Sequence, residues 1–177
     1  LAAIVAGAGP GPFTGLRVGL ATAAVFADAI GRPSYAVCSL DAIACTAVHE
    51  GVDQPFLVAS DARRREIYWG LYSATAHRLV GPAVNRASEV RAWLSGELAL
   101  PGLESPPTRP SWAVGAGAGA YAADLEIPVR SEIEPSIDAL VALAAQRIRA
   151  HAASEPLTPL YLRRPDAMES RERKTVI

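Results

Sequence analysis

The stretch GAGPGPFTGLR at residues 7–17 separates a short apolar run, residues 1–6, from a longer apolar segment, residues 14–30. A short continuous apolar run is typical of a strand covered on both faces, and the longer segment has helical spacing. Strand, glycine-rich loop and helix in this order present the first unpaired N–H groups of the helix to an anion. Thr14 is placed to cap the helix with its hydroxyl group. The stretch therefore predicts either a phosphate-binding loop or a tight turn that begins a helix.

Patterns typical of catalytic sites are missing from the sequence. The loop lacks the Lys-Ser/Thr ending of a P-loop, so no lysine would neutralise a transferring phosphoryl group. His49, His77 and His151 are scattered and form no metal-binding spacing. Neither a G-x-S-x-G elbow nor a serine or cysteine with a histidine nearby in sequence occurs, which leaves only a triad assembled in space. We predict no catalytic residues and no metal site.

Composition points to a protein with a sizeable core and no membrane span. Half of the 177 residues are hydrophobic, 17 are basic and 18 acidic, and Asp28 interrupts the best apolar segment. Cys38 and Cys45 are predicted to be buried free thiols of a cytosolic protein, with a disulfide between them as the alternative. The chain begins at Leu1 inside a predicted core strand. We therefore expect an N-terminal portion beyond this sequence.

The segment at residues 14–30 is apolar on two opposite sides. One stripe comprises Leu16, Leu20, Ala23, Ala27 and Ile30; the other comprises Val18, Ala21 and Val25, with Thr22 beside them. A helix that is hydrophobic all round must be buried on more than one side. We predict that the second stripe is a subunit contact, with burial inside its own fold as the alternative. Gly15 and Gly19 would let another helix approach closely.

Arginines mark two further candidate sites. Arg17, in the first turn of the helix, faces the positive end of the helix dipole, so it is either solvated or paired with an anion or a carboxylate. A polar turn follows the next apolar run of the chain. It comprises Asp61, Arg63, Arg64, Arg65 and Glu66. This turn is either solvated or in contact with phosphate on tRNA or a nucleotide.

The order of predicted elements gives an α/β fold. A strand at 34–38 and a helix from 39 to 50 follow the first strand and helix, which favours a mostly parallel sheet. Strands at 56–59 and 66–72 form a hairpin, with a third strand at 78–84 and a helix at 87–98. A helix opens at Ser136 with Ile137, Leu140, Val141, Ala144 and Ile148 inward, and residues 160–162 form a last strand. We expect a first lobe at 1–52, a second at 53–164 and a disordered tail at 165–177.

A second glycine-rich run lies at residues 115–120. GAGAGA formally satisfies G-x-G-x-x-A, with Glu132 and Glu134 near the distance of a ribose-binding acid. Only about eight helical residues fit before Pro128, fewer than the dozen that a βαβ crossover needs. We therefore predict a close-packed turn rather than a dinucleotide site.

Three motifs together resemble one known family. GPGPFTGLRVGLATA at residues 9–23 closely resembles the GPGSFTGLRIGLATA signature of the TsaB (YeaZ) family, with Pro12 where the family usually has serine. Its glycine-rich loop and helix start comprise Gly9, Gly11, Phe13, Thr14, Gly15 and Arg17. DARRREIY at residues 61–68, with Tyr72, is similar to the family's D-A-R-x-x-E-V-Y segment, and YLR at 161–163 matches its closing motif.

This resemblance implies an actin-like, sugar-kinase-like (ASKHA) fold of two lobes, here without the family's opening D-T-S/A strands. It implies a non-catalytic subunit in the formation of N6-threonylcarbamoyladenosine on tRNA. The helix from Thr14 would meet the catalytic subunit TsaD, or a second copy of the chain in its absence, and a TsaE-like ATPase would join them. No cofactor would bind tightly, ATP or ADP would bind only at the partner interface, and tRNA would be reached through the complex. The alternatives are a glycoprotease-like peptidase and a nucleotide- or dinucleotide-binding enzyme.

Overall fold

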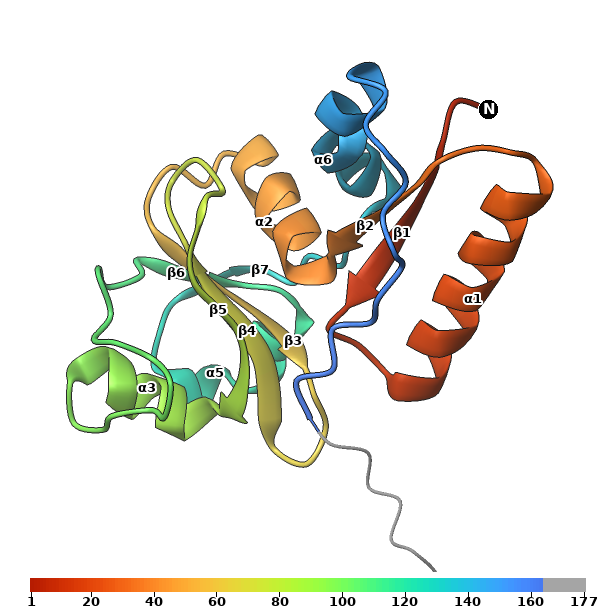
Figure 1. Ribbon diagram of the computed structural model, residues 1–177. Helices are drawn as coiled ribbons and strands as arrows, with labels where there is room; N and C mark the ends of the chain where they lie inside the picture. The colour runs from red at the N-terminus through yellow and green to blue at the C-terminus, as the bar shows by residue number, and fades with distance from the viewer. Residues whose placement is uncertain (164–177) are drawn as a thin grey trace, which may run out of the picture.

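The computed structural model describes residues 1–163 and has the predicted α/β architecture (Figure 1). Its elements are β1 (Ile4–Gly9), α1 (Phe13–Ala29), β2 (Ser34–Cys38), α2 (Ser39–His49), β3 (Phe56–Asp61), β4 (Glu66–Tyr72), β5 (Arg78–Arg86), α3 (Ala87–Ser95), β6 (Trp112–Val114), α4 (Ala116–Ala120), α5 (Ala122–Leu125), β7 (Val129–Ser131) and α6 (Ile137–Arg149). The strands form two separate sheets, and every helix in residues 1–163 is too short or too polar to cross a bilayer.

The first sheet is a parallel pair, β1 and β2, joined through α1. Parallel strands need such a crossover, and a helix is its usual form. A small core lies between this sheet and α6: Tyr35 and Val37 pack with Ala144, and Leu140 and Ile148 surround them. Figure 1 shows α1 alone at the outer flank of the sheet. Helices from the two ends of the chain therefore cover this sheet.

The second sheet has the strand order β5-β4-β3-β6-β7, with antiparallel pairs from β5 to β3 and parallel pairs from β3 to β7. Successive side chains of β3 face opposite ways, as in any strand. Leu57 and Ala59 join the core under α3, whereas Phe56 and Val58 join the core under α2. The β3–β4 hairpin is as predicted. Because α2 packs on this sheet and follows β2 directly, it connects the two sheets.

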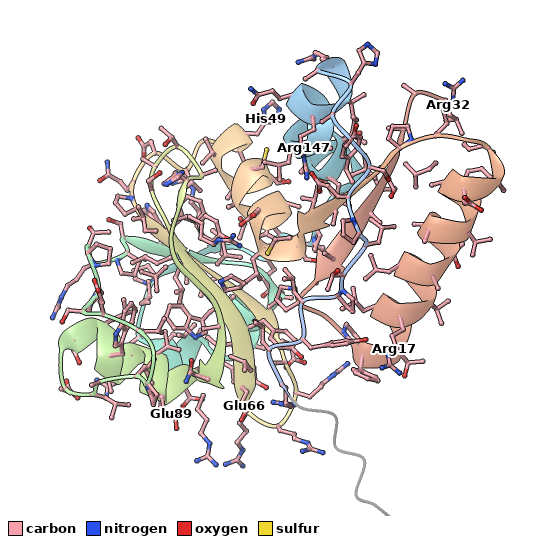
Figure 2. All side chains as sticks on the ribbon, viewed as in Figure 1. Arg17, Arg32, His49, Glu66, Glu89 and Arg147 are labelled. Atoms are coloured by element: carbon pink, nitrogen blue, oxygen red, sulfur yellow. The ribbon has the colours of Figure 1, made fainter. Side chains whose placement is uncertain are left out.

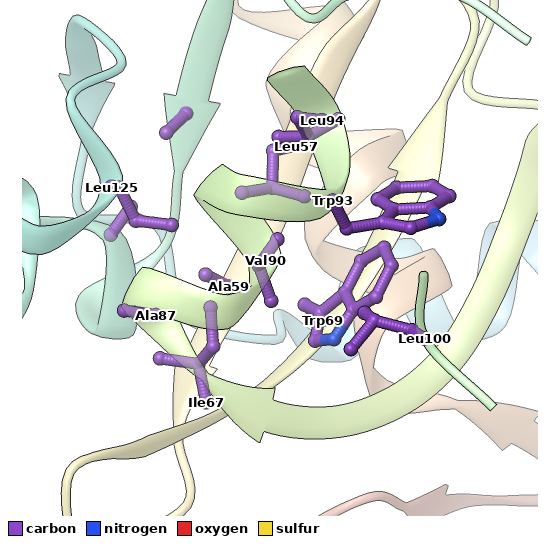
Figure 3. Packing of buried hydrophobic residues seen from close by; sticks show 12 residues of the cluster. Leu57, Ala59, Ile67, Trp69, Ala87, Val90, Trp93, Leu94, Leu100 and Leu125 are labelled. Atoms are coloured by element: carbon purple, nitrogen blue, oxygen red, sulfur yellow. The ribbon is translucent and has the colours of Figure 1, made fainter. Parts of the chain in front are cut away.

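Tryptophans organise the core beneath α3 (Figure 3). The rings of Trp69 and Trp93 lie 5.1 Å apart at a tilt of 50°. Each indole N–H also has an acceptor: Trp69 donates to the Asn85 side chain at 3.0 Å, and Trp93 donates to the Glu104 carbonyl at 3.1 Å. Buried tryptophans need such partners. The bond from Trp93 also fixes part of the proline-rich segment at residues 101–110.

Several sequence predictions are wrong in detail. The cap of α1 is Pro12 and makes no side-chain hydrogen bond, so Thr14 lies inside the helix instead of capping it. Ile137 and Val141, predicted to face inward on α6, are exposed. The helix packs on the first sheet through Leu140, Ala144 and Ile148. Residues 160–162 form no strand, although Leu160 donates its N–H to the Ala8 carbonyl of β1 at 2.8 Å.

The division of the chain between lobes stays a prediction. Residue 52 lies between the two sheets, but α6 comes from the predicted second lobe and packs on the first sheet. The tail predicted at 165–177 lies outside the described residues.

The glycine run at 115–120 is a close-packed turn, as predicted. Gly115 has φ of +101°, and a Cβ atom there would lie 2.4 Å from the Ala59 carbonyl oxygen of β3. The helix that follows, α4, has only five residues. Gly115 is required by packing against β3.

A pair of alanine substitutions tests this assignment. Gly115→Ala should lower the free energy of unfolding by about 3 kcal/mol, because the methyl group clashes with β3 and φ is positive. Gly19→Ala, inside α1 with open space around it, should raise that free energy by about 0.5–1 kcal/mol. Urea unfolding followed by tryptophan fluorescence measures both. Equal stability of the Gly115→Ala variant and the wild type would show that the turn is not tightly packed.

Candidate functional site

The glycine-rich loop and the β3–β4 turn border one cleft of about 500 Å³. The loop side is lined by Gly9, Pro10, Gly11, Pro12, Gly15 and Leu16, and the hairpin side by Ser60, Asp61, Ala62, Arg63 and Tyr68. Ser39, Ala116, Glu134 and Pro135 complete the lining. Two stretches that the sequence presents as separate candidate sites therefore meet in space.

The glycines of the loop have different roles. Gly9 has φ of +92°, and a Cβ atom there would come within 2.9 Å of the Leu16 side chain. Gly11 and Gly15 have no atom within 4 Å of such a Cβ position. Gly9 is thus required by the turn, whereas Gly11 and Gly15 leave space open on the cleft side and at the helix start.

Three consecutive arginines in the β3–β4 turn have left-handed backbone conformations. Arg63, Arg64 and Arg65 have φ of 62°, 56° and 63°. For residues with a Cβ atom this conformation costs about 1–2 kcal/mol each. Hydrogen bonds close the turn at both ends: Ala62 N–H donates to the Glu66 carbonyl and Glu66 N–H to the Arg63 carbonyl, each at 3.0 Å. The turn persists because its surroundings fix it.

Asp61 anchors the start of this turn. Its carboxylate accepts the Arg63 N–H at 2.8 Å and lies 3.3 Å from the Arg63 guanidinium. The Tyr121 hydroxyl donates to the same carboxylate at 3.2 Å. Burial, together with the Asp61 charge, raises the pKa of Tyr121, and burial raises the pKa of Tyr68 on the cleft wall. Both phenols therefore remain protonated donors at neutral pH.

A C-terminal segment, residues 160–163, joins the loop to the turn. Tyr161 stacks on Phe13 with ring centroids 4.7 Å apart, and its hydroxyl accepts the Arg17 Nε–H at 2.8 Å. Arg163 donates to the Ala62 carbonyl at 3.2 Å and forms an ion pair with Glu66. In Figure 1 this segment runs past β1 toward the hairpin.

Arg17 therefore has a partner within the chain. Its guanidinium lies 4.2 Å from the centre of the Phe13 ring, in addition to the bond with Tyr161. The sequence predicted either solvent or an anion for this side chain. In the structure the side chain is exposed and also has a cation–π contact with Phe13 and a hydrogen bond to Tyr161, which fix the first turn of α1 to residues 160–163.

A second polar contact joins α2 to the second sheet. Asp41 Oδ1 accepts the Tyr72 hydroxyl at 2.8 Å and lies 3.2 Å from Arg78 Nη1. Burial, then the Asp41 charge, raises the pKa of the Cys38 thiol and the pKa of Tyr72. Cys38 is therefore held as a neutral thiol in the core.

The outer face of α1 is uncovered. Val18 is 62% exposed, Val25 is 70% exposed and Phe26 is 48% exposed, and Ala21 and Thr22 between them are exposed as well. Spacings of three, four and seven residues place these side chains on one side of the helix. The inner stripe meets β1, where Leu20 and Ala27 are buried. The two-faced pattern predicted from sequence is therefore present, and its second face is open.

Groups for catalysis are sparse in this part of the chain. The residues of 1–163 that line the cleft include no histidine and no cysteine. Within the same range, no cluster of three His, Cys, Asp or Glu side chains is arranged to hold a metal ion. The charged lining consists of Asp61, Arg63 and Glu134, of which the first two pair with each other.

In the structure, some of the predicted site residues line the cleft, others form the open face of α1, and the rest lie outside the cleft. Gly9, Gly11, Gly15, Asp61 and Arg63 share the cleft. Val18, Ala21, Thr22 and Val25 form the open face of α1. Phe13, Thr14, Arg17, Arg64, Arg65 and Glu66 do not line the cleft.

Sequence reasoning missed the contacts of Tyr161 and Arg163, and the parts played by Tyr68, Tyr121 and Glu134. Tyr161 and Arg163 belong to the YLR motif and Tyr68 ends the DARRREIY motif, but neither motif indicated these contacts; Glu134 was considered only as a ribose-binding acid, and Tyr121 carried no signal.

Comparison with known proteins gives consistent results. Residues 1–171 match the family model described as "TsaD: tRNA N6-adenosine threonylcarbamoyltransferase". An uncharacterized protein of Mycobacterium tuberculosis is 45% identical over 167 residues, which are 94% of this chain and 66% of that protein. The tRNA threonylcarbamoyladenosine biosynthesis protein TsaB of Bacillus subtilis is 40% identical over 73 residues, 41% of this chain and 31% of that protein. The chain spans about two thirds of its mycobacterial relative.

Solved structures of YeaZ resemble the fold. YeaZ from Pseudomonas aeruginosa has a TM-score of 0.67 and 27% identity, covering 88% of this chain and 72% of that one. A second Pseudomonas aeruginosa structure, described as similar to peptidase YeaZ, has a TM-score of 0.68 and 26% identity, covering 89% and 71%. The likeness extends over both sheets and supports the predicted ASKHA-like fold.

The strained turn predicts that glycine improves stability. Arg65→Gly should raise the free energy of unfolding by about 0.5–1 kcal/mol, because relief of the left-handed strain exceeds the extra entropy of unfolded glycine. Arg86→Gly is the matched control, since Arg86 has φ of −67° at the start of α3 and should gain nothing. Urea unfolding reports both values. A less stable Arg65→Gly variant would contradict the strain.

The two cysteines should differ in reactivity. Cys38 is buried with a raised thiol pKa, whereas Cys45 is half-buried beside an opening between α2 and α6. Iodoacetamide should therefore modify Cys45 at least tenfold faster, because the thiolate is the reactive form. Mass spectrometry of the folded protein gives the two rates, and the urea-unfolded protein, where both should react alike, is the control. Equal rates in the folded state would refute the burial of Cys38.

Proposed function

Since the chain belongs to the TsaB (YeaZ) family, within the wider family described as TsaD, we propose that it is a non-catalytic subunit in the formation of N6-threonylcarbamoyladenosine on tRNA. In this role it binds a TsaD-like catalytic subunit, a TsaE-like ATPase joins the pair, and ATP or ADP binds only at the interface with the partner. The complex works in the cytoplasm.

The open face of α1 is the observation that supports this proposal. Val18, Val25 and Phe26 expose large apolar side chains in one stripe. Full burial of a side chain of this kind contributes about 1.5–3 kcal/mol. Contiguous apolar patches on a protein surface mark interaction sites. Thr22 and Ala21 keep the stripe shallow, which lets a partner helix lie against it. In the absence of the TsaD-like subunit, a second copy of the chain takes its place.

The start of this helix is held firmly enough to serve as a docking surface. Phe13, Arg17 and Tyr161 fix its first turn through ring stacking and a hydrogen bond. A rigid surface loses less conformational entropy on binding than a mobile one. The cleft beside it, with its opposed Asp61 and Arg63, offers no acid–base pair for a separate reaction, which favours a partner role over the peptidase alternative.

Charged substitutions on α1 test the interface. Val18→Glu, Ala21→Glu and Val25→Glu should each weaken binding to the TsaD-like subunit at least tenfold, because an unpaired carboxylate would be buried. Isothermal titration calorimetry measures the dissociation constants, and circular dichroism confirms that each variant is folded.

Ile137→Glu on α6 is the matched control, because Ile137 is 78% exposed and lies on a different helix. Its affinity for the partner should equal that of the wild type. Undiminished binding by all three α1 variants, or an equal loss with Ile137→Glu, would overturn the assignment of α1 as the interface.

A further inference from the structure

We propose that the β3–β4 turn, with Arg63, Arg64 and Arg65 at its tip, contacts the phosphate backbone of RNA directly. This inference rests on the proposed function, which brings a tRNA to the complex. It adds a contact made by this chain itself, where the resemblance implied only an indirect approach through the partner.

The backbone of the turn displays its arginines outward. All three are exposed, and the side chain of Arg63 is 88% exposed. Their left-handed conformations are unfavourable, yet hydrogen bonds at both ends of the turn and the contacts of Arg163 maintain them. Strained residues that their surroundings hold in place are concentrated at functional positions. Here the result of the strain is a rigid tip that carries three guanidinium groups.

Two further arginines lie close to the turn. Arg163 lies against the turn through Ala62 and Glu66, and Arg86 is the cross-strand partner of Glu66. Arg17 lies at the same end of the molecule as Glu66, and Arg32 lies at the opposite end of α1 (Figure 2).

A polyanion fits this surface better than a mononucleotide. In the adjacent cleft, a nucleotide phosphate would meet one guanidinium, Arg63, together with the carboxylates of Asp61 and Glu134. Arg64 and Arg65, by contrast, are exposed and do not line the cleft, so an extended chain of phosphates that passes Arg63 at the cleft also meets the turn outside it. Guanidinium groups pair with phosphate through two parallel hydrogen bonds, which favours arginine at such a contact.

The test measures binding of this chain to a fluorescein-labelled, unmodified tRNA transcript by fluorescence anisotropy. The variant is Arg63→Asn, Arg64→Asn and Arg65→Asn combined, since asparagine tolerates the left-handed conformation. Affinity should fall at least tenfold at low salt. The slope of log affinity against log salt should become shallower by about 2, the value for three lost phosphate contacts on single-stranded RNA. Thermal unfolding checks that the variant is folded.

The matched control removes the same charge elsewhere, with Arg32→Asn, Arg109→Asn and Arg149→Asn combined, all exposed residues. This variant should keep its affinity within about threefold. Equal losses in both variants, no loss in the turn variant, or no binding by the wild type would overturn the inference. A competition experiment compares polyglutamate with unlabelled tRNA. If polyglutamate displaces the labelled tRNA with equal efficiency, the inference is overturned in favour of an acidic protein partner.

Calorimetry with the TsaD-like subunit separates this inference from the proposed function. A turn variant that loses tRNA affinity but binds the TsaD-like subunit as the wild type does supports both. A wild-type chain that binds tRNA through the turn but not the TsaD-like subunit supports the RNA contact and overturns the proposed function. If the wild-type chain binds the TsaD-like subunit but the turn substitutions do not change tRNA affinity, the proposed function is supported and the RNA contact is overturned.

Discussion

The contacts of residues 160–163 hold the functional end of the molecule together. Tyr161 fixes the first turn of α1 through Phe13 and Arg17, and Arg163 fixes the β3–β4 turn through Ala62 and Glu66. The two turns belong to different sheets, which no hydrogen-bonded strand pair joins within residues 1–163. A short segment far along the chain therefore sets the distance across the cleft.

Because contacts between distant parts of the chain form the cleft, the sequence predicted the individual elements but not the site. Strands, helices and the hairpin were predictable from local periodicity. The cleft was not, because residues 9–15 and 61–63 meet only through the arrangement of two sheets. Arg17 has no signal for its partner, since Tyr161 lies 144 residues away. Local rules also misplaced Ile137 and Thr14, where packing and proline geometry decide.

The apolar face of α1 shows why a pattern can be right and still incomplete. Helical periodicity identified two stripes and favoured the second as a subunit contact, but it left burial of that stripe within the chain's own fold as an alternative. The first sheet offers one surface to α1, and Leu20 and Ala27 occupy it. Val18 and Val25 are left outside because no second layer is packed there in residues 1–163. The three-dimensional structure was needed to decide between the two alternatives for the second stripe.

Two features that lower the stability of the protein belong to the elements that residues 160–163 contact, the β3–β4 turn and α1. Left-handed arginines strain the β3–β4 turn, and exposed valines leave apolar surface in water along α1. Sequences that specify a fold break local rules mainly where function requires it. Since Tyr161 and Arg163 are two residues apart, a displacement of this segment would disturb the start of α1 and the arginine turn together. The proposed protein interface and the proposed RNA contact are therefore mechanically linked through residues 160–163.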